Sequence, residues 1–138
     1  MTRHVNWQRR LSRVIEAART KPHDWNGHCC ASFAMKRCYF AVTGRLLPCN
    51  YFFRTYANKE EANEVLAQMG CADIEELVAT FLERHNAPGL IRRGDIGVIE
   101  DSGRKALVIC TGARCFATGA DCLVSVPRDR VIAAFKVD

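Results

Sequence analysis

The chain has 138 residues, of which 49% are hydrophobic and 25% are charged, and its formal net charge is +5 at pH 7. These values are typical of a folded globular domain and exclude a disordered or collagen-like chain. Lysines and arginines are scattered along the sequence, so the charge does not favour a nucleic-acid-binding protein. No stretch of 18 apolar residues is present, so no membrane-spanning helix is expected.

The N-terminal segment predicts an amphipathic helix over residues 6–19. Its apolar side chains recur at helical spacing and form one stripe, opposite a face rich in arginine: Trp7, Leu11, Val14, Ile15 and Ala18. The segment has neither a continuous apolar core nor a small-residue cleavage site, so it is not read as an export signal. We therefore expect a protein that is made in a reducing cytoplasm.

The most informative stretch runs from Pro22 to Gly44. A loop rich in turn-forming residues carries Trp25 and leads to two adjacent cysteines, Cys29 and Cys30. Helical spacing of apolar residues begins there and continues until Gly44. A thiol on the first turn of a helix lies near unpaired backbone N–H groups and the positive end of the helix dipole, which favour the thiolate form.

The next segment, residues 45–54, has no regular pattern, and its aromatic residues at 51–53 are expected to cover the core. Two helices then begin at capping boxes, Asn58 with Glu61 and Asp73 with Glu76. The first of these helices is predicted to end at Gly70.

The last third of the chain changes to the pattern of strands and turns. Strands are predicted at residues 94–100, 105–111, 114–117, 122–126 and 131–137. Four helices followed by about five strands predict an α+β fold, in which the helices pack on an antiparallel sheet. No linker or repeat interrupts the pattern, so residues 1–138 are interpreted as a single domain.

Eight cysteines are present, and none shows a paired C-x-x-C spacing. Cys110, Cys115 and Cys122 fall on a predicted hairpin, but their spacing is a weak match to any zinc or cluster pattern. Most of the cysteines are expected to be buried as small hydrophobic side chains. The sequence therefore predicts no metal site and no cofactor.

Two segments carry a family resemblance. WNGHCCASFA, from Trp25 to Ala34, resembles the nucleophile segment of NlpC-type peptidases, compact papain-like enzymes that cut peptidoglycan stem peptides; RRGDIGVIE, from Arg92 to Glu100, resembles their GD strand. With further short motifs in the same order, the chain is similar to a group of small proteins of tailed phages and prophages. The resemblance implies a papain-like NlpC-type fold, in a protein made in the host cytoplasm and carried at the tail tip of the virion.

The resemblance also assigns roles to individual residues. Cys30 is the nucleophile equivalent, or Cys29 if one residue is deleted after Trp25. The catalytic histidine of the family would fall at 105–106, but these residues are Lys and Ala, and no histidine occurs between 86 and 138. His28 and His23 are then the remaining candidates to pair with the thiol, although a structural role is the simpler interpretation of His28. His85 is expected at the surface or at a helix end.

Two binding residues are proposed beside the cysteine. Trp25 is a core or rim aromatic or, in the sharper alternative, stacks on a ligand. Asp95, at the turn into the first strand, is expected to bind backbone N–H groups rather than to catalyse. Three functions remain open. The favoured one is a structural tail-tip protein that binds hub and tail-tip proteins during genome delivery, and the alternative is a cysteine endopeptidase that cuts peptidoglycan during phage entry. The third, the least favoured, is a protein that holds a metal ion or cluster through its cysteines.

Overall fold

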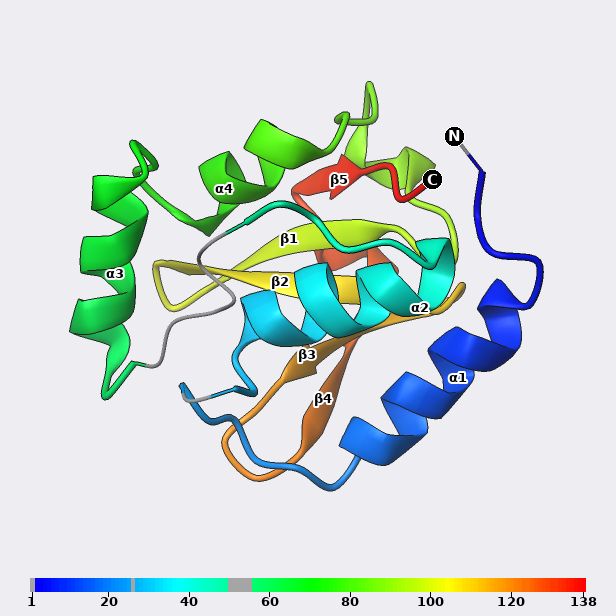
Figure 1. The fold of residues 1–138 in the computed structure, drawn as a ribbon, viewed down its shortest axis with the longest axis horizontal. Coiled ribbons are helices and arrows are strands. Elements are labelled where there is room, and N and C mark those ends of the chain that lie inside the picture. Colours follow the sequence, from blue (N-terminus) through cyan, green and yellow to red (C-terminus); the bar gives the residue numbers. More distant parts are fainter. Residues whose placement is uncertain (1, 26, 50–55) are drawn as a thin grey trace.

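In the computed structural model, a long helix crosses one face of a five-stranded sheet (Figure 1). The structure describes residues 2–25, 27–49 and 56–138. The helices are α1 (Trp7–Ala18), the π-helical segment η1 (Ser32–Cys38) with its continuation α2 (Tyr39–Thr43), α3 (Lys59–Gln68) and α4 (Ile74–Phe81). Within this part of the chain no helix is long and apolar enough to cross a membrane.

All neighbouring strands of the sheet are antiparallel, in the order β4-β3-β2-β1-β5. The strands are β1 (Ile96–Asp101), β2 (Arg104–Cys110), β3 (Arg114–Thr118), β4 (Leu123–Pro127) and β5 (Ala133–Phe135). The predicted α+β class and the antiparallel sheet are confirmed. Predicted and observed strand ends differ by one or two residues in most cases, and β5 is the shortest of the five relative to its prediction.

The sheet is buried on both faces, which explains the unbroken apolar run of β2. Leu107 and Ile109 point to the face covered by the long helix, where they join Phe33 in the main core. Val108 and Cys110 point to the opposite face and join a second, smaller cluster. The other members of that cluster lie on the remaining strands and directly after the short helical turns η3 (Pro88–Leu90) and η4 (Arg128–Arg130): Ile91, Ile99, Cys115, Ala117, Val126, Val131 and Ala134.

Helix boundaries follow the capping signals in the sequence. The side chain of Asn58 accepts a hydrogen bond from the N–H of Glu61, and that of Asp73 accepts one from the N–H of Glu76, each at 3.0 Å. These bonds satisfy donors that have no partner inside the helix. Both predicted capping boxes are therefore confirmed. The expectation that the aromatic residues at 51–53 cover the core lies outside the described residues.

Candidate functional site

Cys29 and Cys30 lie on different sides of the start of the long helix. The first turn is held by the N–H of Phe33, which donates to the carbonyl of Cys29, and by the N–H of Cys29, which donates to Ser32 Oγ, both at 2.9 Å. Cys29 is 3% exposed and belongs to the main core, whereas Cys30 lines a cavity. Of the two cysteines that the resemblance could assign as the nucleophile equivalent, Cys30 is the one that reaches the cavity.

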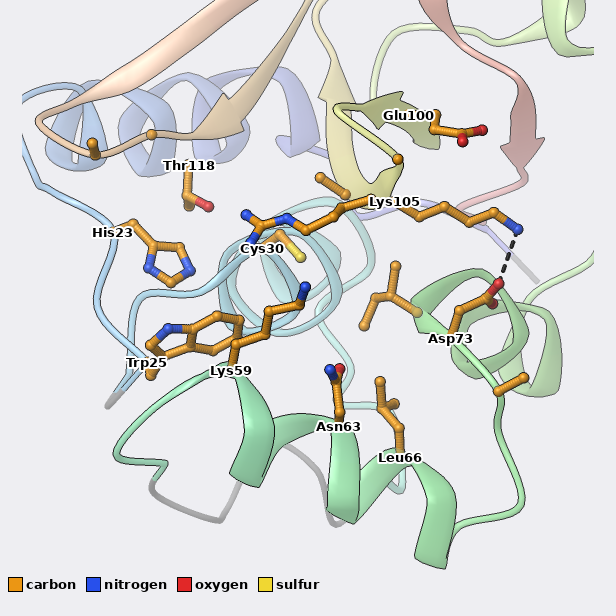
Figure 2. A pocket seen from close by; sticks show the side chains of 17 residues that line it. His23, Trp25, Cys30, Lys59, Asn63, Leu66, Asp73, Glu100, Lys105 and Thr118 are labelled. Carbon is orange, nitrogen blue, oxygen red and sulfur yellow. Dashed lines mark hydrogen bonds and ion pairs between the residues drawn. The ribbon is translucent and has the colours of Figure 1, made fainter.

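The cavity beside Cys30 has a volume of about 720 Å³. His23 and Trp25 line it from the loop before the helix, and α3 contributes Lys59 and Asn63 (Figure 2). Leu66 of α3 also lines it. The wall is completed by the β1–β2 hairpin, by residues at and just before the start of α4, and by the end of β3 with its connection to β4: Glu100, Gly103, Arg104, Lys105, Ala106, Ala72, Asp73, Ile74, Thr118, Gly119 and Ala120. The volume is in the usual range of small-molecule and cofactor pockets.

The thiol of Cys30 is held in its neutral form. Burial, with a further contribution from Cys29, raises the pKa of Cys30 to about 12. Backbone N–H groups act in the opposite direction but do not outweigh burial. The sequence-based expectation that the helix start favours the thiolate is therefore wrong for this cysteine, because removal from water disfavours the charged form more strongly than the helix stabilises it.

His28 is directed away from the cavity. Its Nδ1 lies 3.1 Å from an Arg37 guanidinium nitrogen, and its ring packs edge-on against Phe33 at 5.7 Å between centroids. Burial, then the charge of Arg37, lowers the pKa of His28, so the neutral ring accepts the Arg37 hydrogen bond. His28 does not line the cavity beside Cys30, and the interpretation of His28 as a partner of the thiol gains no support from its position.

The backbone of the Trp25 loop explains this orientation. Asp24 and His28 pair in a short antiparallel bridge, with N–H to O distances of 3.0 and 2.8 Å. Residues directly opposite in such a bridge place their side chains on one face, and their chain neighbours point to the other face. His23 and Trp25 therefore face the cavity, while His28 lies on the same side as Asp24.

His23 is the histidine that shares the cavity with Cys30 (Figure 2). Its ring meets Trp25 edge-to-face at 4.6 Å between centroids. The backbone N–H of His23 donates to Gly119 O at 2.7 Å. Burial lowers the pKa of His23, assisted by Arg104 and opposed by Asp24. Among the described residues, no histidine forms a hydrogen bond with the Cys30 sulfur.

Lys105 occupies the place where the family resemblance would put a catalytic imidazole. Its ammonium group turns away from Cys30 and lies 2.9 Å from Asp73 (Figure 2). It also lies 3.1 Å from Glu75. Hydrogen bonds to these carboxylates raise the pKa of Lys105 to about 12. This side chain joins β2 to the start of α4 and offers no proton acceptor to the thiol.

Asp95 is a structural carboxylate, buried away from the cavity. Its oxygens accept hydrogen bonds from the backbone N–H groups of Arg92 and Val137, as expected from its position at the turn, at 3.0 and 3.1 Å. Arg3 and His85 also contact it, at 2.9 and 2.8 Å. The expectation of a surface or helix-end position for His85 is wrong: the chain after α4 runs beside β5 and carries this ring inward.

The cysteines behave mainly as apolar core residues, as the sequence predicts. Six of the eight are buried, Cys122 is exposed, and all eight are free thiols. Across residues 2–25, 27–49 and 56–138, no group of three or more His, Cys, Asp or Glu side chains could hold a metal ion.

Comparison with known families covers nearly the whole chain. A family described as a domain of unknown function (DUF6950) matches residues 2–137. The chain belongs to the DUF6950 family. No curated protein and no solved structure matches it. The matched region of this DUF6950 chain contains every residue of the cavity beside Cys30.

The cavity of this DUF6950 protein also contains residues that the sequence did not single out. Lys59 and Asn63 lie on α3, and Arg104 lies on β2 next to the hairpin turn. One local signal for Lys59 exists: it occupies the first position of a helix, where a cation is disfavoured by the dipole and acidic residues are preferred. Arg104 carries no such signal, because its place at the cavity depends on long-range folding.

Proposed function

We propose that this protein is a structural component of a bacteriophage tail tip, with a papain-like NlpC-type fold that binds partners instead of cleaving peptides. In this proposal the chain is made in the host cytoplasm, is carried in the virion and contacts hub or tail-tip proteins. The likeness of Trp25–Ala34 and Arg92–Glu100 to NlpC-type segments supports the origin of the fold. The phage setting rests on the order of the short motifs.

One observation carries the non-catalytic part of the proposal. The thiol at the start of the helix faces a cavity, but burial raises its pKa to about 12, and no described histidine is hydrogen-bonded to it. Thiol peptidases need a thiolate, an imidazole that exchanges its proton with the leaving group, and a site for the oxyanion. Cys30 has the position of a nucleophile, but no imidazole among the described residues is placed to take the proton from its thiol.

A second candidate function is a cysteine endopeptidase that acts on peptidoglycan stem peptides. It is favoured by the position of His23, an imidazole with a lowered pKa in the same cavity as Cys30. Hydrogen bonds between a nucleophile and its base can be long in a ligand-free site and shorten when substrate binds. A ligand that moves the His23 ring toward the sulfur would complete the pair.

Incubation of the purified protein with peptidoglycan separates the two candidates. We expect no new stem-peptide termini by mass spectrometry, and the same result for Cys30→Ala. Cleavage that disappears in both Cys30→Ala and His23→Ala would instead establish the peptidase. Mass spectrometry of purified phage particles, with the tail separated from the capsid, tests the location: the chain is expected in the tail fraction, and its absence from particles contradicts the structural role.

A further inference from the structure

Two cations at the cavity beside Cys30 have no anionic partner. Neither the Lys59 side chain nor the Arg104 side chain forms a hydrogen bond or ion pair with another described residue, although both residues line the cavity. Lys105, the third cation of the wall, is paired with carboxylates. In Figure 2 the Lys59 side chain extends from α3 into the cavity, between Trp25 and Asn63. Unpaired ammonium and guanidinium groups at the mouth of a pocket favour an anionic ligand.

We propose that this cavity holds a short acidic peptide segment of a protein partner, whose carboxylates bind Lys59 and Arg104 while an apolar side chain packs on Trp25. This inference rests on the proposed binding role of the protein and names the chemistry of its partner. The amide of Asn63 and the hydroxyl of Thr118 line the same wall and can bond the peptide backbone. Apolar contact is available from Leu66, Ile74 and Ala106.

The charge pattern favours separate carboxylates over a continuous polyanion. Asp73 and Glu100 line the cavity together with the cations, and a nucleic-acid backbone would bring phosphates close to both carboxylates. A peptide can place its acidic residues beside Lys59 and Arg104 and leave other positions uncharged. A volume of about 720 Å³ accommodates a few residues of extended chain.

The neutral thiol is consistent with a bound rather than a cleaved segment. A pKa of about 12 leaves Cys30 protonated at neutral pH, so a peptide bond beside it meets a weak nucleophile. Cys30 then contributes a small apolar surface to the inner wall of the cavity. A partner segment can remain in place instead of being released as product.

Fluorescence anisotropy with a labelled peptide tests the inference. The probe is fluorescein-labelled Leu-Glu-Ala-Glu-Leu amide, compared with its counterpart in which both glutamates are glutamine. We expect the glutamate peptide to bind at least about tenfold more tightly, since each charge-assisted hydrogen bond is worth about one order of magnitude in affinity. Lys59→Gln and Arg104→Gln should each weaken binding by about tenfold, and added salt should weaken it further.

Arg13→Gln is the matched control, because Arg13 is an exposed cation on α1 that does not line the cavity. It should leave the dissociation constant within about twofold. Equal binding of both peptides, no binding, or equal loss in all three variants overturns the inference. Binding of the muropeptide L-alanyl-D-glutamyl-diaminopimelate in place of the glutamate peptide also overturns it. None of these outcomes alters the peptidoglycan or virion tests, so failure here is distinguishable from failure of the proposed function.

A second inference comes from the opposite face of the sheet, where Cys110 and Cys115 lie directly across from each other on β2 and β3. The next pair toward the turn is hydrogen-bonded, with Thr111 N–H donating to Arg114 O at 2.9 Å. Cys110 and Cys115 therefore form a non-hydrogen-bonded pair, the position where side chains of antiparallel strands approach most closely. Cα separations at such positions, about 4.5 Å, lie within the range that a disulfide spans.

The surroundings of Cys110 favour a thiolate. Gly112 N–H donates to Cys110 Sγ at 3.4 Å, and Arg128 binds Gly112 O at 2.9 Å. A hydrogen bond from Cys115 lowers the pKa of Cys110, against the effect of burial. The same hydrogen bond raises the pKa of Cys115, so Cys110 is the thiol of the pair that loses its proton more readily.

We infer that Cys110 and Cys115 form a reversible disulfide in the presence of a small disulfide oxidant such as oxidised glutathione. The Cys110 thiolate attacks one glutathione sulfur, and the other glutathione leaves as its thiolate. Cys115 then gives its proton to that thiolate and attacks the Cys110 sulfur, which releases the second glutathione thiolate. Two protein thiols are oxidised, and one glutathione disulfide is reduced to two thiols. Access requires local opening at the turn, which lies one residue from the pair.

Peptide mapping after incubation in oxidised glutathione tests this inference, in a Cys122→Ser background that removes the exposed thiol. We expect a peptide cross-linked between Cys110 and Cys115, its loss on reduction, and its absence in Cys110→Ser. The inference is overturned if mild urea makes Cys110 accessible and the cross-link still does not form. So does scrambled pairing, in which Cys38 or Cys71 is linked as often as Cys115.

Discussion

Nε2 of His85 lies 2.8 Å from Oδ2 of Asp95, and this buried contact joins the segment after α4 to the turn that begins β1. The same carboxylate also binds Arg3 and the N–H of Val137, so both ends of the described chain meet at one residue. We expect Asp95→Asn to lower the free energy of unfolding by about 3 kcal/mol, because an amide cannot accept from all of these donors. Urea unfolding followed by circular dichroism measures the change.

Asp129→Asn is the control for this prediction. Asp129 lies on η4 and is exposed, so the same change of charge there should alter the free energy of unfolding by less than about 0.5 kcal/mol. Similar losses in Asp95→Asn and Asp129→Asn would show that the buried carboxylate is not a centre of stability.

Gly97 on β1 is expected to tolerate no larger side chain. A Cβ atom there would lie 3.0 Å from Ile91 Cδ1, 3.1 Å from Val108 Cγ2 and 3.1 Å from Val131 Cγ1, on the face of the smaller core cluster. Gly97→Ala should therefore lower the free energy of unfolding by about 1–3 kcal/mol through overpacking. Gly89→Ala is a matched control, since nothing lies within 4 Å of its Cβ position. Equal stability of the two variants would contradict the packing argument.

The lowered pKa of His28 predicts that the folded protein loses stability in mild acid. Burial and Arg37 lower its pKa below the ordinary value of 6.5, so the folded protein binds this proton less readily than the unfolded chain. The neutral His28 ring contributes its full share to the free energy of unfolding above pH 6.5. This contribution falls as the pH drops below 6.5, and the loss levels off below the pKa of His28 in the folded protein. The urea midpoint of the protein should therefore fall more steeply between pH 7 and pH 5 than that of His28→Phe. Parallel profiles would contradict this prediction.

Local signals predicted most of the fold. The capping boxes at Asn58 and Asp73 act within four residues, so they could be recognised without knowledge of the tertiary structure. The change to strand and turn residues likewise located β1 and β2, and the unbroken apolar run of β2 agrees with its burial on both faces of the sheet.

The candidate site was harder to predict, because its chemistry depends on the direction in which side chains point rather than on their spacing in the sequence. His28 lies closer to Cys30 in the sequence than His23, yet the Asp24–His28 bridge turns His28 away and places His23 at the cavity. His85 is buried through backbone pairing with β5, a contact between distant segments that no local pattern indicates. The neutral state of Cys30 follows from tertiary burial, which overrides the local effect of the helix start.

Cys30 is expected to react slowly with iodoacetamide at pH 7 despite its place at the start of a helix. Burial raises its pKa to about 12, so the reactive thiolate is scarce at neutral pH, and the rate should still be rising at pH 9. Cys122 is the internal control, because it is exposed and should be modified first. Mass spectrometry of peptides after timed labelling of the native protein measures both rates in one sample. Rapid labelling of Cys30 at pH 7, lost in His23→Ala, would show that the imidazole activates the thiol and would favour the peptidase over the structural protein.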